Sequence, residues 1–139
     1  MIYIEEFTIL TPEQAENWLN NNCDAHCTKQ YYPFRVFESR VPKLELGNIT
    51  ILYGGNGSGK TTILNLMSEK LRLPRSTPYN RTSFFEEFVE MCGMRVAGED
   101  SGYPERIPVQ SRFIGSDDVF EHILRLREKN DNRELAAAR

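Results

Sequence analysis

Residues 54–61 read Gly-Gly-Asn-Gly-Ser-Gly-Lys-Thr, and the segments on either side determine how this run is interpreted. Before it, residues 49–53 are β-branched, apolar or aromatic, a composition that predicts a buried strand. After it, apolar residues recur with helical spacing at positions 63, 64, 66, 67 and 71. The sequence therefore predicts a strand, a glycine-rich loop and a helix in succession.

The eight residues fit the pattern G-x-x-x-x-G-K-[ST] of the phosphate-binding P-loop, or Walker A motif. Glycines can adopt positive φ and turn their N–H groups toward an anion, and the following helix start adds unpaired donors and partial positive charge. Lys60 is expected at the β- and γ-phosphates, Thr61 at Mg²⁺ and Thr62 at an α-phosphate oxygen. The alternative, a glycine-rich turn with a chance lysine, fits the flanking segments poorly. The predicted nucleotide-binding residues are Gly54, Gly55, Asn56, Gly57, Ser58, Gly59, Lys60, Thr61 and Thr62.

Composition places the chain among ordinary soluble proteins. Its 139 residues suffice for one domain with a core, and its net charge of −3 argues weakly against nucleic-acid binding over the whole surface without excluding a local basic patch. No stretch is apolar enough to cross a membrane, and the N-terminus lacks a signal-peptide layout, so we expect a cytoplasmic protein. Cys23, His26 and Cys27 form a cluster that could bind a metal. Their spacing is not that of a zinc knuckle, so free thiols are favoured.

Around the loop, the sequence predicts a mixed sheet followed by helices. We expect a strand over residues 2–10 and a helix to about residue 20, with Thr11 as N-cap, Pro12 first in the helix, and Trp18 and Leu19 inward. Residues 31–37 are predicted to be extended and to pair with residues 44–46. Residues 73–81 read as a loop, 84–92 as a short helix running into a strand at 94–96, 98–108 as a polar turn, and 111–116 as another strand.

A long final helix is predicted from residue 117 onward, capped by the run Ser-Asp-Asp at 116–118. No glycine or proline C-cap follows it, so we expect a truncated chain or one ordered only to this point. One face of the helix carries Val119, Phe120, Ile123, Leu124 and Arg127.

Residues 50–71 resemble the nucleotide-binding head of ABC-type ATPases, in the branch that includes SMC, RecF and related AAA ATPases. The loop of that branch commonly reads G-x-N-G-[SA]-G-K-[ST]-T, which Asn56, Ser58 and the residues from Lys60 to Thr62 match. Phe34 and Arg35 lie about where the branch keeps a Phe-Arg pair, which implies that Arg35 lies near the nucleotide. Residues 113–120, Phe-Ile-Gly-Ser-Asp-Asp-Val-Phe, stand where such heads leave the sheet through the Q-loop into a helical arm.

The resemblance implies an α/β P-loop NTPase fold, namely lobe I of an ABC-type head with a mixed sheet around the strand, loop and helix. The whole chain 1–139 would be this N-terminal lobe, divided into a sheet arm (1–53), the P-loop and helix (54–73), a loop-rich region with a strand (74–116) and an exit helix (117–139). It also implies ATP and Mg²⁺ as cofactors, and a homodimer or multiprotein assembly with ATP between two heads. Nucleic acid is a possible partner, because such ATPases serve DNA repair, chromosome organisation or phage defence.

Several parts of the family pattern are absent from this sequence. There is no run of four apolar residues followed by Asp-Glu (Walker B), no Leu-Ser-Gly-Gly signature and no switch histidine, since His122 falls within the final helix. In that family the second lobe supplies these parts. Asp117 or Asp118 would occupy the Q-loop position, with Gln110 as the competing candidate, and both acids could equally cap the helix.

The adenine contact is also open. Tyr31 and Tyr32 stand where transporter-type heads place a stacking aromatic, but packing in the core is the favoured role for these rings.

Three functions remain. The leading one is the ATP-binding portion of an ABC/SMC-like ATPase, with hydrolysis requiring a second lobe. The second is a partner-binding or dimerisation module. The third is a small-molecule kinase, with Arg72, Arg75 and Arg81 as lid residues.

Overall fold

Strand β1 (Ile4–Thr8) is the centre of a three-stranded antiparallel sheet in the order β2-β1-β3. The computed structural model describes residues 1–22, 32–33, 36, 43–76, 78–79, 81–82 and 84–137, without the side chains of 131–137. In β2 (Lys43–Glu45), Leu44 lies opposite Phe7, and in β3 (Gly93–Val96), Met94 lies opposite Phe7 on the other side. The sheet therefore joins segments far apart in the chain.

Residues 43–45 pair with β1, while the predicted pairing of residues 44–46 with residues 31–37 stays a prediction. Most of 31–37 lies outside the described residues. This register places Leu44 and Met94 opposite the buried Phe7, one on each side of β1.

Helix α1 (Pro12–Asn22) begins with a reciprocal capping box. The Gln14 N–H donates to Thr11 Oγ1 at 3.2 Å, and the Thr11 N–H donates to Gln14 Oε1 at 2.9 Å. Two N–H groups that the helix leaves unpaired are thereby satisfied. The predicted N-cap at Thr11 is confirmed, as is the inward side of the helix, where Leu19 is buried and Trp18 meets the Phe84 ring edge-on at 5.9 Å.

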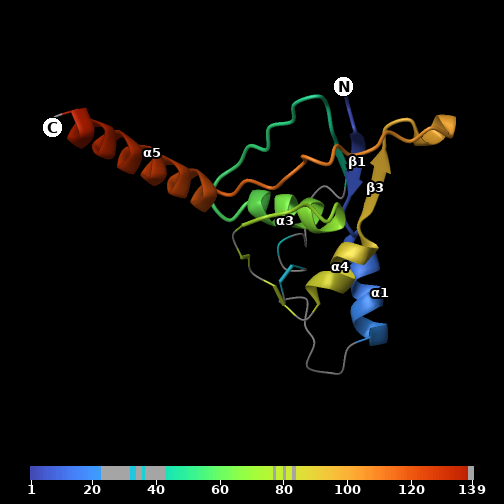
Figure 1. Cartoon of the computed structure of the whole chain (residues 1–139). Helices are drawn as coiled ribbons and strands as arrows, with labels where there is room; N and C mark the ends of the chain where they lie inside the picture. The colour runs from blue at the N-terminus through green and yellow to red at the C-terminus, as the bar shows by residue number, and fades with distance from the viewer. Residues whose placement is uncertain are drawn as a thin grey trace.

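Helices α3 (Lys60–Lys70) and α4 (Phe85–Met91) pack together, with α3 beside the lower end of the sheet and α4 below it in the view of Figure 1. The last turn of α3 also caps α4, because Lys70 Nζ donates to the carbonyls of Val89 and Glu90 at 3.2 and 3.0 Å. The core between these elements contains Phe7, Ile9, Leu10, Leu19, Leu66, Phe85, Phe88, Val89 and Cys92. The predicted short helix and following strand are thus confirmed.

Two predicted strands, at 49–53 and 111–116, do not form. Residues 49–53 run without regular secondary structure, and Ile49, Ile51 and Tyr53 are 87, 83 and 100% exposed. A strand requires a neighbouring strand for its backbone groups. Within the described ranges the sheet around β1 contains neither segment, so the parallel sheet of a P-loop fold is not seen there.

In place of the second predicted strand, residues 111–115 run without regular secondary structure between a turn and the final helix. The Ser111 N–H donates to the Pro108 carbonyl at 2.9 Å, and the Phe113 N–H donates to the Pro74 carbonyl at 3.1 Å. Helix α5 (Ser116–Ala137) then begins. Together with the short 3₁₀ helix η1 (Glu99–Ser101), these elements give a mixed α/β architecture, which confirms the expected class in its coarse form.

Helix α5 extends away from the rest of the molecule, with the C-terminus at its far end (Figure 1). Its start is fixed by Asp118, whose carboxylate accepts the Gly115 N–H at 2.7 Å, so the predicted capping role is confirmed for Asp118. The predicted apolar face is exposed: Phe120 is 67% and Leu124 56% exposed. Among the described residues, no helix combines the length and apolar character needed to span a membrane.

Candidate functional site

The glycine-rich loop leads directly into α3, and two of its glycines adopt left-handed backbone angles. Gly57 has φ 75°, and Gly59, the N-cap of α3, has φ 88°. A side chain is disfavoured in this region, which explains glycine at both positions. The Ser58 N–H donates to the Gly55 carbonyl at 3.2 Å and closes the turn. The predicted helix after the loop is thus confirmed, while the strand before it is not.

Lys60 is the first residue of α3, and its side chain folds back over the loop. Its Nζ donates to the carbonyls of Gly54 and Gly55 at 2.7 and 2.8 Å and to Ser58 Oγ at 3.1 Å. An ammonium group has three donors, so these contacts use its whole capacity. The cation therefore lies at the loop beside the N-terminus of a helix, where the backbone also favours negative charge.

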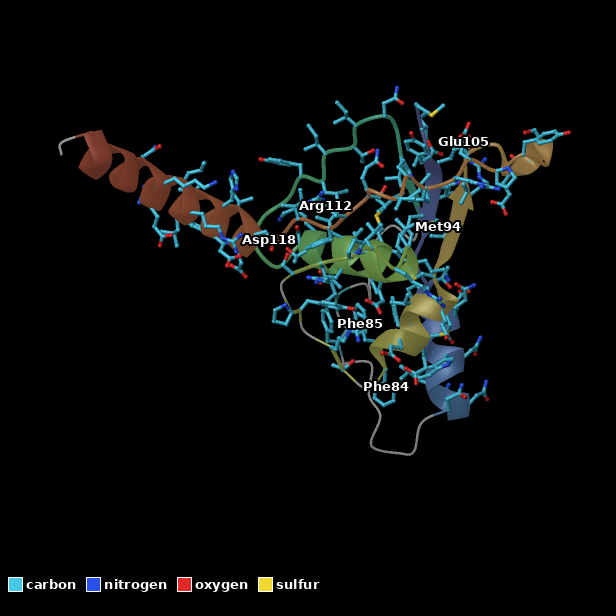
Figure 2. The ribbon with its side chains drawn as sticks, viewed as in Figure 1. Phe84, Phe85, Met94, Glu105, Arg112 and Asp118 are labelled. Carbon is cyan, nitrogen blue, oxygen red and sulfur yellow. The ribbon has the colours of Figure 1, made fainter. Side chains whose placement is uncertain are left out.

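A pocket of about 520 Å³ lies beside the first turn of α3. Figure 1 shows that α5 begins near this end of α3, and Figure 2 shows Asp118 there. The walls are formed by the first two turns of α3, the loop after α3 and the segment leading into α5, together with Tyr32. The lining residues are Tyr32, Thr61, Thr62, Leu64, Asn65, Arg75, Pro78, Tyr79, Phe113, Ile114, Gly115, Ser116 and Asp117.

This pocket brings together two residues that the sequence predicted separately. Thr61, the expected Mg²⁺ ligand, and Asp117, a candidate at the Q-loop position, line the same space, and both are exposed. Gln110 is placed differently, because it lines a neighbouring pocket of about 310 Å³, which shares Arg75 and Phe113 with the first. Thr62 is buried at the pocket wall. Among the pockets described here, Asp117 is therefore the Q-loop candidate that shares a cavity with Thr61.

Arg75 connects the walls of the pocket. Its guanidinium carbon lies 3.9 Å from the centre of the Tyr79 ring and 4.3 Å from that of Phe113. Its Nη1 donates to Asn65 Oδ1 at 3.0 Å, which satisfies a buried amide on α3. From the sequence, Arg75 was expected only as a candidate lid residue. A usable signal was Asn65, a polar residue beside the apolar Leu66 on a helix that must be packed.

The other arginines proposed for a kinase lid have different surroundings. Arg81 pairs with Glu69 and donates from Nε to the Tyr79 hydroxyl at 2.8 Å, while Arg72 is exposed. Burial raises the pKa of Glu69, but hydrogen bonds from Tyr79 and Arg81 outweigh it and keep that pKa below its usual value. Arg75 and Arg81 therefore contribute to the packing of the loop after α3, so a lid function would require breaking these contacts.

Tyr32 belongs to the core as well as to the pocket. Its ring stacks on Phe85 with centroids 6.0 Å apart and planes 7° from parallel, and its carbonyl accepts the Thr82 hydroxyl at 2.6 Å. The favoured core role is thus confirmed for Tyr32.

Other predicted site residues lie outside the described residues: Tyr31, Phe34, Arg35, Cys23, His26 and Cys27. Within the part of the chain that is described, no group of three His, Cys, Asp or Glu side chains is arranged to hold a metal.

Comparison of the chain with protein-family models, with curated proteins and with solved structures gives no match. A functional conclusion therefore depends on the loop, the pocket and their chemistry.

Proposed function

We propose that the chain binds ATP with Mg²⁺ at residues 54–62, as the ATP-binding portion of an ABC/SMC-like ATPase. The observation that carries the proposal is the position of Lys60. Its ammonium lies within a loop shaped by left-handed glycines, at the first residue of a helix. This combination of a cation, small residues and a helix N-terminus suits a polyphosphate.

The residues present fit the two cofactors. Phosphate oxygens would take over donors that Lys60 now gives to the Gly54 and Gly55 carbonyls. Mg²⁺ prefers oxygen ligands and usually keeps several waters, and the exposed Thr61 hydroxyl and Asp117 carboxylate supply oxygens to one pocket. The cofactor would neutralise charge on the phosphates, while the chain would bind and orient them.

Hydrolysis by this chain is expected to be negligible. The family mechanism activates water with a glutamate that follows Walker B, and this sequence contains no such segment. The segment before the loop is also not in a sheet. We therefore assign nucleotide binding to residues 54–62 and place the catalytic acid in a second lobe.

Calorimetric titration of ATP with Mg²⁺ tests the proposal directly. Lys60→Ala should weaken binding strongly, because it removes an ammonium group that lies directly against the loop. Lys129→Ala is a matched control, since Lys129 is exposed on α5. Equal affinity of wild type and Lys60→Ala would refute the nucleotide site. Robust ATP turnover that is lost in Lys60→Ala would refute the assignment of catalysis to a second lobe.

A partner-binding or dimerisation module is the second candidate, and the exposed face of α5 favours it. Val119, Phe120 and Leu124 are 49, 67 and 56% exposed on a helix that extends from the body. Such a face is typical of an interaction surface. Light scattering after size-exclusion chromatography, with and without ATP and Mg²⁺, tests this candidate. A monomer under both conditions would count against assembly by this chain.

A further inference from the structure

Arg75 lies where three parts of the chain meet, and it contacts a residue of each part. Asn65 is on α3, Tyr79 is in the loop after α3, and Phe113 is in the segment that leads into α5. The guanidinium is close to both rings, in the range for cation–π attraction. A planar cation suits this arrangement because it can face two rings and still donate a hydrogen bond at its edge.

The segment from Phe113 to Asp117 has few other described ties to the body. The backbone hydrogen bond from Phe113 to the Pro74 carbonyl, at 3.1 Å, is one of them. Ile114 beside it is 64% exposed, and α5 projects outward. The contact between Arg75 and Phe113 is therefore well placed to hold this wall of the pocket against α3.

We propose that Arg75 is a positioning residue, whose guanidinium holds the segment 113–117 against α3 so that Asp117 remains in the same pocket as Thr61. The part of this proposal that concerns Mg²⁺ at Asp117 rests on the proposed function, since the metal would bind together with ATP. Mg²⁺ demands near-ideal octahedral geometry. A carboxylate that is already placed avoids the entropic cost of ordering its segment when the metal arrives.

Amide hydrogen exchange measured by NMR tests the structural part without nucleotide. The variant is Arg75→Lys, because lysine keeps the charge and can still donate to Asn65 but lacks the plane that faces both rings. Exchange of the Phe113 N–H should become about tenfold or more faster, because local opening of the segment becomes easier. Exchange at Leu66, in the core of α3, should stay unchanged.

Arg81→Lys is the matched control. Arg81 also faces the Tyr79 ring, at 5.0 Å, but it pairs with Glu69 on α3 and makes no described contact with Phe113. Exchange at Phe113 should therefore equal that of the wild type in Arg81→Lys. Unchanged exchange in Arg75→Lys, or equal acceleration in both variants, would overturn the positioning role.

ATP titrations with Mg²⁺ and with EDTA test the metal part. Arg75→Lys should reduce the factor by which Mg²⁺ tightens ATP binding and leave the affinity in EDTA unchanged. In an Asp117→Asn background, Arg75→Lys should cause no further reduction, because both changes act through the same carboxylate. Equal losses with Mg²⁺ and with EDTA would indicate a merely structural role, and a retained Mg²⁺ effect would refute the link to the metal.

Failure of the proposed function gives a different result. In that case wild type and Lys60→Ala bind ATP equally, or neither binds it. The metal role then falls with the nucleotide site, whereas the exchange experiment still decides whether Arg75 holds the segment.

Discussion

Gly54→Ala and Gly55→Ala form a matched pair that tests whether the loop geometry is the one that binds nucleotide. A Cβ added at Gly54 would lie 2.7 Å from Ser58 Oγ and 3.1 Å from Ser58 Cβ, and the φ of Gly54 is 155°. At Gly55 an added Cβ meets nothing within 4 Å, and the φ of Gly55 is not positive. The two substitutions add the same methyl group to neighbouring positions.

The expected size of the effect follows from the strain. A residue forced into a sparsely populated backbone region costs on the order of 1–3 kcal/mol, which corresponds to about 5- to 150-fold in an equilibrium. The methyl group at Gly54 must also displace Ser58 Oγ, one of the three acceptors around Lys60. If ATP binds this loop conformation, its Kd should rise by about that factor in Gly54→Ala and stay near the wild-type value in Gly55→Ala.

Isothermal titration of ATP with Mg²⁺ into the wild type and the two variants measures the Kd of each. Far-UV circular dichroism shows whether each protein is folded. Wild-type affinity in Gly54→Ala would show that the bound loop differs from the one described. An equal loss in Gly55→Ala would show that the phosphates approach Gly55 too closely for any side chain, so that the apo geometry does not set the affinity.

Three further expectations concern stability and reactivity. Phe85→Ala should lower the free energy of unfolding in urea by about 3–5 kcal/mol, because the ring is fully buried and meets Tyr79 edge-on at 5.3 Å. A loss below about 1 kcal/mol would contradict the central place of Phe85 in the core. Burial raises the pKa of the Cys92 thiol from 9.0 to about 12, so iodoacetamide should alkylate it about 1000-fold more slowly than an unhindered thiol. Peptide mass spectrometry measures this rate, and rapid alkylation of the folded protein would argue against burial. The pKa of Glu69 is lowered in the folded state, so the contribution of its carboxylate to stability is present above the ordinary pKa of 4.5 and is lost as the pH falls through the folded pKa. The urea midpoint should therefore fall less on acidification in Glu69→Gln than in the wild type. Parallel curves of midpoint against pH would contradict the pairing of Glu69 with Arg81.

Helices could be predicted from the sequence because their determinants are local. Thr11 and Gln14 form the cap of α1 within one turn, and Asp118 fixes the start of α5 through the neighbouring Gly115. Helix α3 follows from the spacing of its apolar residues after the glycine loop. Each of these features depends on residues within a few positions of one another.

Strands were predicted less reliably than helices. The sequence pattern of a strand identifies residues that can pair but not the strand with which they pair. Ile51 and Tyr53 have strand-like neighbours in the sequence, yet they are exposed and outside the sheet. Conversely, Leu44 pairs beside Phe7, a contact that depends on the path of the intervening chain. The same difference holds for the candidate functional site. The glycine-rich loop could be predicted from its sequence motif, whereas the contacts of Arg75 with Asn65 and Phe113 depend on tertiary structure.

The two sides of the loop are held in different ways, and this affects how strongly a nucleotide can bind. On the helix side, α3 is anchored by the fully buried Leu66. On the other side, residues 49–53 belong to no strand, and Lys60 itself reaches across to the carbonyls of Gly54 and Gly55. Lys60 is therefore both the expected phosphate ligand and a residue that holds the loop in its described conformation.

Because Lys60 has both roles, phosphate binding exchanges contacts instead of simply adding them. Hydrogen bonds to charged groups contribute about 1.5–3 kcal/mol each, so every carbonyl contact that Lys60 gives up offsets much of a phosphate contact that it gains. The net gain must come from the negative charge of the phosphates, the N–H groups of the loop and Mg²⁺. A segment that paired with residues 49–53 would hold Gly54 and Gly55 independently of Lys60 and would thereby tighten nucleotide binding, with the reciprocal effect of nucleotide on that pairing.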